Sequence, residues 1–273
     1  MITARSRRRR GWHLRIMPVP APAFLAAAWL VLIALAGLDA GPAQAASPDP
    51  VDLALVLAVD VSDSIDDGEF RLQRQGYAAA FEDPRVTDAI ALGAHGRIVV
   101  TLMHWASASE QRQVLGWTQI ADREGARAFA ALVATAPRTA FPGGSTSLSG
   151  AITGALWLFE TGGYKGARRV IDISGDGINN NGRPPEFARD EAITAGVTVN
   201  GLAILSDDLL LERYFEARVM GGPGAFVVTV DSSAAIAGTL VVKLVREIAG
   251  LSLPLPEAQL AGAFPLAGSG QAR

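Results

Sequence analysis

The residues LALVLAVDVSDS, positions 53–64, divide into an apolar run and a polar loop. The run 53–59 contains no polar side chain, which is typical of a central parallel strand that is buried on both faces. Asp60, Ser62 and Ser64 would then follow directly where this strand ends. In open parallel sheets, the loops beyond the carboxyl ends of the strands form the binding crevice. This stretch therefore predicts an α/β fold and the edge of the sheet at which a site should lie.

Strand and helix patterns alternate along the rest of the chain. Apolar runs predict further strands at 97–105, 112–117, 169–174, 197–204 and 225–230. Helical spacing predicts helices at 68–81, 123–135, 148–159, 185–195 and 209–219, and a last helix from Asp231 or Ser232 to about 248. The segment 112–117 returns across a short Ser-Ala-Ser turn and should pair antiparallel. The predicted fold is a doubly wound α/β domain, with a mostly parallel six-stranded sheet, one antiparallel edge strand and helices on both faces.

The two ends of the chain differ from this pattern. Residues 1–45 resemble a secretory signal peptide, with arginines at 7–10, an apolar run at 24–38 and a small-x-small site before Ala46. As a helix the run spans about 22 Å, less than the roughly 30 Å of a bilayer core, so cleavage near Ala45 is favoured over an uncleaved membrane anchor. We expect a domain at 46–250, periplasmic or secreted, and a flexible tail at 251–273.

Composition excludes several classes of function. Removing the six Arg and one Asp of residues 1–45 from the 24 basic and 27 acidic residues leaves 18 and 26, a net charge of −8. A nucleic-acid-binding domain would instead carry a basic stripe. The chain has no Cys, which excludes disulfides, thiolate metal sites and thiol catalysis.

Two further polar loops should lie at the same edge of the sheet as residues 60–64. One is 143–147, GGSTS, which enters a helix, and the other is 174–177, SGDG, which follows a strand. The three loops together offer the carboxylates of Asp60 and Asp176 and the hydroxyls of Ser62, Ser64 and Thr146. Oxygen ligands of this kind suit a hard cation, most simply Mg²⁺, with Mn²⁺ or Ca²⁺ also compatible and Zn²⁺ or copper a poor match.

The order D-x-S-x-S, then G-G-x-T before a helix, then D-G after the fourth strand resembles the von Willebrand factor A (vWA) domain with its metal-ion-dependent adhesion site. The resemblance covers about residues 51–249, and the sequences at 168–177 and 221–226 resemble an uncharacterised proteobacterial branch of this superfamily. It implies that Ser62 and Ser64 bind the ion directly and that Thr146 joins them when a ligand is engaged. Asp60 and Asp176 would act mostly through water. The implied partner is a protein that presents an Asp or Glu carboxylate to the ion.

Two positions depart from the family pattern. Leu148 occupies the place of a second hydroxyl residue, so Ser145 is a rival to Thr146 as a ligand, although the spacing favours Thr146. Gly175 occupies the place of a Thr, which removes no ligand. Other polar residues have plainer interpretations. These are Asp63, Asp66 and Asp67 as a loop and helix cap, Asn179 to Asn181 as a turn or a partner-binding face, His104 as a structural residue, and Asp172 as the partner of a neighbouring Arg.

Catalysis is the alternative function, in the form of a metal-dependent hydrolase that uses the same ion as a Lewis acid. A serine hydrolase would need a G-x-S-x-G pentapeptide, which the chain lacks. A haloacid-dehalogenase-type phosphotransferase would need Asp at position 62, where Ser62 stands. We therefore expect a binding domain rather than an enzyme.

Overall fold

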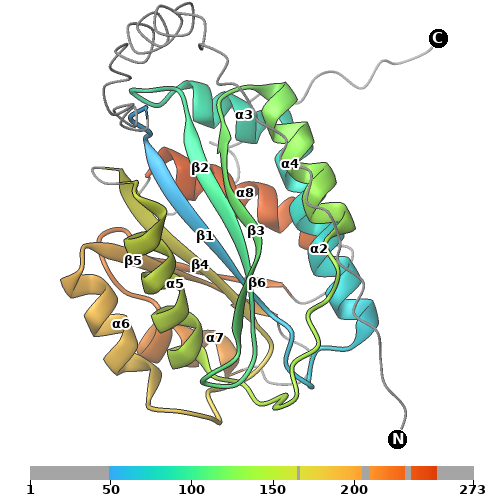
Figure 1. The fold of residues 1–273 in the computed structure, drawn as a ribbon, viewed down its shortest axis with the longest axis vertical. Helices are drawn as coiled ribbons and strands as arrows, with labels where there is room; N and C mark the ends of the chain where they lie inside the picture. The colour runs from blue at the N-terminus through green and yellow to red at the C-terminus, as the bar shows by residue number, and fades with distance from the viewer. Residues whose placement is uncertain (1–48, 165–166, 205–209, 231–234, 251–273) are drawn as a thin grey trace, which may run out of the picture. The chain divides into compact units, whose positions relative to one another are not determined.

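Six strands form one twisted sheet in a computed structural model that describes residues 49–164, 167–204, 210–230 and 235–250 (Figure 1). The strands are β1 (Leu53–Asp60), β2 (Ile98–Trp105), β3 (Gln111–Ile120), β4 (Arg168–Gly175), β5 (Val197–Ile204) and β6 (Val227–Val230). Their order is β3-β2-β1-β4-β5-β6, with β3 antiparallel to β2 and the other pairs parallel. This confirms the predicted sheet with one antiparallel edge strand.

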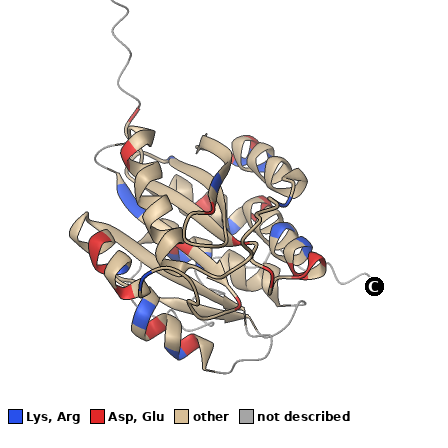
Figure 2. Cartoon of the chain, turned by 60° about the horizontal axis from the view of Figure 1, so that its bottom comes forward, with Lys and Arg blue, Asp and Glu red and all other residues tan. Residues whose placement is uncertain are grey.

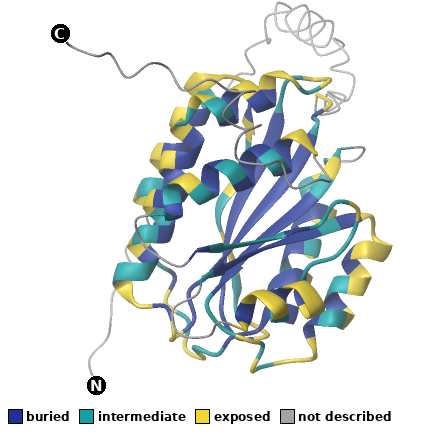
Figure 3. Cartoon of the chain, turned by 180° about the vertical axis from the view of Figure 1, so that it is seen from behind, coloured by how far each residue is buried: buried dark blue, intermediate teal, exposed yellow. Residues whose placement is uncertain are grey.

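Helices cover both faces of this sheet, as predicted. One face packs against α2 (Asp67–Glu82), α3 (Pro84–Ala91), α4 (Arg123–Thr135) and α8 (Ile236–Ala249). The other packs against α5 (Leu148–Gly162), α6 (Pro185–Thr194), α7 (Leu211–Tyr214) and the π-helical turn η1 (Phe215–Val219). Alternate residues of β1 supply the two cores, with Leu53, Leu55 and Leu57 on the first side and Ala54 and Val56 on the second. Figure 3 shows the buried strands between the more exposed outer faces of the helices.

The strand order reverses beside β1, which fixes the position of a crevice. β1 pairs with β2 on one side and with β4 on the other. The ends of β1 and β4 are neighbours, but the loop after β1 leads to α2 on one face of the sheet and the loop after β4 leads to α6 on the other face. Ligand sites of open α/β sheets lie at such switch points. No helix among the described residues is both long and apolar enough to cross a bilayer.

The structure departs from the predicted elements in several places. Helix α3 was not predicted, although Asp83 caps it and Pro84 stands at its first position. Strand β6 is shorter than the predicted 225–230, and the predicted helix at 209–219 is one α-helical turn followed by a π-helical one. The last helix begins at Ile236, after Ala235. The predicted leader at 1–45, the caps Asp231 and Ser232, and the tail at 251–273 lie outside the described residues.

A buried ionic cluster joins α8 to the middle of the sheet. The Nζ of Lys243 lies 2.8 Å from Oδ1 of Asp172 and also forms an ion pair with Glu247, and all three side chains are buried. Tyr77 donates to Asp172 at 3.3 Å, and Asn200 donates to Glu247 at 3.0 Å. The prediction that Asp172 pairs with an Arg was therefore wrong: its partner is Lys243, which lies 71 positions further along the chain.

Glu247 should make the folding stability depend on pH. Burial and the nearby charge of Asp172 raise the pKa of Glu247 to about 7. Unfolded Glu titrates near 4.5, so between these pH values the folded state holds a proton that the unfolded state has released, and stability falls as the pH rises. We expect a loss on the order of 1–3 kcal/mol across this window in the wild type, and a flatter profile in Glu247→Gln.

Denaturant unfolding of both proteins at several pH values between 5 and 8 tests this. Asp60 and the other titrating groups that both proteins share contribute equally to the two pH profiles of stability, so their contributions cancel when one profile is subtracted from the other. Identical profiles would contradict the prediction. The ionisable groups that face Glu247 are Lys243 and Arg246 on α8, Asp172 and Arg168 on β4, and Tyr77 on α2.

Candidate metal-binding site

Four side-chain oxygens from three loops lie in contact at the carboxyl ends of β1 and β4. Ser62 Oγ is 3.1 Å from Ser64 Oγ, and Ser64 Oγ donates to Asp176 Oδ1 at 2.8 Å. Thr146 Oγ1 donates to Ser62 Oγ at 3.4 Å. The structure thus brings together segments that lie 84 and 112 positions apart in the sequence.

Asp60 completes the cluster from the end of β1. Its Oδ1 accepts a hydrogen bond from the backbone N–H of Ser62 at 2.8 Å, while its Oδ2 is buried and has no hydrogen-bond partner among the described residues. Burial, and to a smaller extent the charge of Asp176, raises the pKa of Asp60 to about 7. Burial also raises the pKa of Asp176. A cation beside these carboxylates would offset both effects.

The cluster is buried on one side and open on the other. Asp60 and Ser62 are fully buried and Thr146 is 4% exposed, whereas Ser64 is exposed and Asp176 is half-buried. An ion held by the five oxygens would therefore have protein beneath it and solvent above it.

The structure separates Thr146 from its rival Ser145. Ser145 Oγ donates to the carbonyl of Gly143 at 3.4 Å, within its own loop, whereas Thr146 Oγ1 points to Ser62. Asn180 fixes this position because its Oδ1 accepts from the backbone N–H of Thr146 at 2.8 Å. Asn181 accepts a hydrogen bond from the backbone N–H of Ala108, and Asn179 accepts one from the backbone N–H of Ser149. The turn at 179–181 therefore links the loop after β4 to the loop after β2 and to the start of α5.

Both departures from the family pattern have a structural reason. A Cβ at Gly175 would lie 3.1 Å from Asp60 Oδ2 and 3.4 Å from the ring of Trp105, so a larger residue would press on the buried carboxylate. Leu148 is fully buried and packs in the core beneath α5. Neither position removes an oxygen from the cluster.

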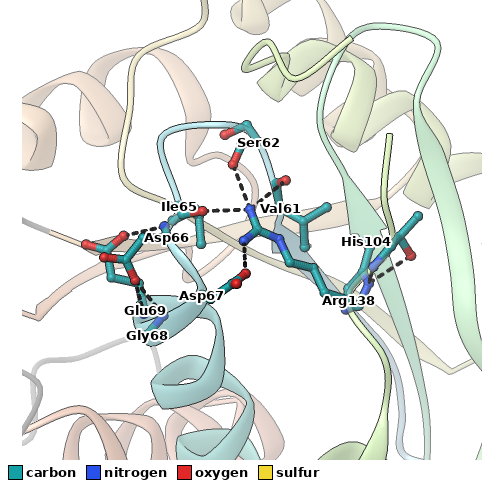
Figure 4. Close-up of polar contacts among 10 residues, drawn as sticks. Val61, Ser62, Ile65, Asp66, Asp67, Gly68, Glu69, His104 and Arg138 are labelled. Carbon is teal, nitrogen blue, oxygen red and sulfur yellow. Dashed lines mark hydrogen bonds and ion pairs between the residues drawn. The ribbon is translucent and has the colours of Figure 1, made fainter. Parts of the chain in front are cut away.

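Arg138 is the residue of this site that the sequence did not reveal. Its guanidinium lies within the loop after β1, where Nη2 donates to the carbonyls of Val61 (3.3 Å), Ser62 (3.2 Å) and Ile65 (2.6 Å), as Figure 4 shows. Its Nη1 pairs with Asp67 at 2.8 Å. One cation therefore holds the turn that carries both serines. No sequence pattern marks such a residue, because its partners are main-chain carbonyls more than 70 positions away.

We expect Arg138→Met to lower the free energy of unfolding by about 2–3 kcal/mol, because several carbonyls lose a charged donor. Cation affinity should also fall, because the loop loses its brace. Arg138→Lys keeps the charge without the planar fork and should be intermediate. Denaturant unfolding and cation titration of both variants provide the measurement, and wild-type values for Arg138→Met would refute the bracing role.

The other polar residues near the loop have structural roles. Asp66 caps α2 by accepting from the N–H groups of Gly68 and Glu69 (Figure 4). His104 is buried, and its Nδ1 accepts from the N–H of Thr139 at 3.3 Å. Burial and the nearby charge of Arg138 lower the pKa of His104 to about 4, so this imidazole is neutral near pH 7.

The donor set consists of oxygen atoms, from hydroxyl and carboxylate groups. Within the part of the chain that the structure describes, no group of three His, Cys, Asp or Glu gathers as a metal site. Coordination would depend on hydroxyls together with two carboxylates, and Mg²⁺ accepts such oxygens. Figure 2 shows that basic and acidic positions alternate along the ribbon of the described residues.

Comparison with known proteins agrees with the fold. The family described as "Protein of unknown function (DUF1194)" matches residues 50–252. No curated protein matches the sequence. Among solved structures, proximal thread matrix protein 1 from the mussel byssus, with a zinc-occupied MIDAS motif, is similar with a TM-score of 0.55 and 16% identity, over 73% of this chain and 48% of that one.

Two further structures share the fold at low sequence identity. The pilus adhesin SpaC from Lactobacillus rhamnosus GG has a TM-score of 0.54 and 15% identity, over 73% of this chain and 30% of that one. The SpRpn10 VWA domain has a TM-score of 0.51 and 14% identity, over 70% and 94%. The chain thus spans about half of the mussel protein and less of the adhesin. The fold is vWA-like, as the sequence predicted.

Proposed function

We propose that this chain, which belongs to the DUF1194 family of proteins of unknown function, binds a divalent cation at Asp60, Ser62, Ser64, Thr146 and Asp176 and through it an acidic group of a partner protein. The observation that carries the proposal is the unpartnered, buried Oδ2 of Asp60 beside three clustered hydroxyls and a second carboxylate. A buried carboxylate oxygen without a partner is costly, and a bound cation would offset that cost.

Cation binding is the first step to test. We expect isothermal titration of the purified chain with Mg²⁺ and Mn²⁺ to show one site, with Ca²⁺ and Zn²⁺ as comparison ions. Ser62→Ala and Thr146→Val should weaken binding by more than the roughly 10–100-fold that loss of an outer-shell partner costs.

Ser145→Ala is the matched control, because its hydroxyl lies one residue from Thr146 but bonds only within its own loop. It should bind the cation as the wild type does. Loss of binding in Ser145→Ala with retention in Thr146→Val would reverse the ligand assignment. Equal binding by all the proteins would refute the site.

The partner's acidic group follows from charge. Two carboxylates roughly neutralise a dication, so the ion keeps an affinity for one more anionic oxygen on its open side. This explains how residues 46–273, with 26 acidic and 18 basic side chains, would recognise an acidic group. Proteins retained from an envelope extract with Mg²⁺, and neither with EDTA nor on Ser62→Ala, would be the partners.

We favour binding over hydrolysis because Asp60 and Asp176, the two carboxylates of the cluster, are both assigned to the cation, so neither would be free to act as a general base. The imidazole of His104 is neutral, buried and bonded to Thr139. Ion-dependent turnover in a phosphatase and esterase screen would support the hydrolase instead. Export is part of the same proposal, and detection of an amino terminus at Ala46 on the periplasmic or secreted protein would support it.

A further inference from the structure

A cavity of about 360 Å³ opens at the opposite edge of the sheet from the candidate metal site. Arg168 and Arg169, the first residues of β4, lie on its wall, while Asp176 follows the other end of that strand. Arg246 and Phe226 line it from α8 and from the segment before β6. Val170, Ile193 and Pro223 add apolar surface to its wall, beside glycines and the polar Thr198, Asn200 and Glu247. The cavity thus combines three guanidinium groups with an apolar surface.

Two of these arginines have no acidic partner. Arg168 donates to the carbonyl of Ile248 at 2.7 Å, and Arg169 donates to the carbonyl of Ala195. Among the described residues, neither lies within 4.0 Å of a carboxylate oxygen, although seven other arginines do. Both guanidinium groups are therefore held by carbonyls at helix ends, and Arg168 also feels the charges of Glu247 and Asp52 without forming an ion pair with either.

Glu247 is the single acidic residue of the lining, which holds three arginines. Glu247 already pairs with Lys243 and accepts from Asn200 at 3.0 Å. Burial lowers the pKa of Arg168 and of Arg246, although Arg168 as a whole residue is exposed. Arg246 is also stacked at 3.8 Å from the ring centre of Phe226, which orients it. A cavity with this charge attracts anions, although the chain as a whole is acidic.

We propose that this cavity binds a small organic oxyanion, a carboxylate or a phosphate monoester, that carries an apolar body. The guanidinium forks match the paired oxygens of either group, and the wall formed by Phe226 and its apolar neighbours accepts the body. The volume lies at the lower end of the range for small-molecule sites, roughly 300–1,000 Å³. This site is separate from the cation site and does not depend on it.

Titration calorimetry of the chain in EDTA tests the proposal, because no cation is then present to hold an anion at the other edge. The probes are benzoate and phenyl phosphate, with inorganic phosphate and benzyl alcohol as the matched compounds that lack the body or the charge. We expect one or both aromatic anions to bind and both matched compounds to bind more weakly. Which aromatic anion binds more tightly identifies the oxyanion.

Arg246→Gln and Arg169→Gln should each weaken this binding about tenfold or more. Arg127→Gln, on the exposed face of α4, changes the charge equally and should leave it unchanged. Ser62→Ala should also bind the anion as the wild type does. The proposal is overturned if no aromatic anion binds at about 10 mM, if inorganic phosphate or benzyl alcohol binds equally well, or if Arg127→Gln weakens binding as much as Arg246→Gln.

Discussion

Replacement of Asp60 by Asn is expected to remove divalent-cation binding while leaving the cation-free protein at least as stable as the wild type. The two effects have one cause. Asp60 is fully buried, its Oδ2 has no hydrogen-bond partner among the described residues, and the second carboxylate of the site, Asp176, adds repulsion. Without a cation this charge opposes folding, and with a cation it attracts the ion.

The substitution retains most of the local structure. The Oδ1 of Asn can still accept from the N–H of Ser62, which is the bond that shapes the turn. Because the buried negative charge disappears, we expect the free energy of unfolding in EDTA at pH 8 to rise by roughly 1–3 kcal/mol. In saturating Mg²⁺ the order should reverse, since only the wild type gains stability from a bound ligand.

Denaturant unfolding in EDTA and in Mg²⁺, together with calorimetry, measures both effects. Asp63→Asn is the control, because Asp63 is exposed and its carboxylate lies against Gly144, outside the chain of hydrogen-bonded oxygens. It should match the wild type in each measurement. Normal Mg²⁺ binding by Asp60→Asn would contradict the role of Asp60 in holding the cation. Clear destabilisation of this variant in EDTA would show that Asp60 has a structural role instead.

The sequence predicted the strands and the site loops because local patterns encode both. A fully apolar run such as 53–59 has few alternatives to a buried strand, and the hydroxyls and carboxylates follow such runs directly. Parallel pairing then brings the strand ends to one edge. Helix α3 was missed although Asp83 and Pro84 form an ordinary helix start, because it has only eight residues and begins directly after α2.

Residues that act over long sequence distances escaped prediction. Arg138 braces a loop through carbonyls, which any residue supplies, so no spacing identifies it. Lys243 lies on a helix among apolar residues and is fully buried, against the usual exposure of Lys. Its burial is explained by its ion pairs with Asp172 and Glu247. The pair with Asp172 forms only because α8 packs on the sheet, which the sequence does not reveal.

Removal of this buried cation should cause the largest loss of stability that a single substitution produces in the described core. In Lys243→Met, the carboxylates of Asp172 and Glu247 would remain buried without a cation between them. We expect the free energy of unfolding to fall by about 3–5 kcal/mol at pH 8, a large part of the roughly 5–15 kcal/mol typical of a domain. Met fills most of the space of the Lys stem, so the loss reports charge more than packing.

The pH dependence separates this explanation from a simple packing defect. Without Lys243 the buried carboxylates lose the cation that stabilises their charge, so the pKa of Glu247, already raised in the folded wild type, should rise further. The destabilisation should therefore shrink as the pH falls toward 5 and grow as it rises toward 8. A cavity or an overpacked side chain would cost the same at both pH values.

Two comparison proteins complete the test by denaturant unfolding. Lys243→Met combined with Glu247→Gln removes one of the stranded charges and should regain part of the loss, which gives a coupling energy for the pair. Arg123→Met breaks the exposed pair with Asp88, whose side chains are 60% and 52% exposed, and should cost less than about 1 kcal/mol. If Lys243→Met costs no more than Arg123→Met, the two carboxylates must be neutral in the wild type, and the cluster is then held by hydrogen bonds rather than by charge.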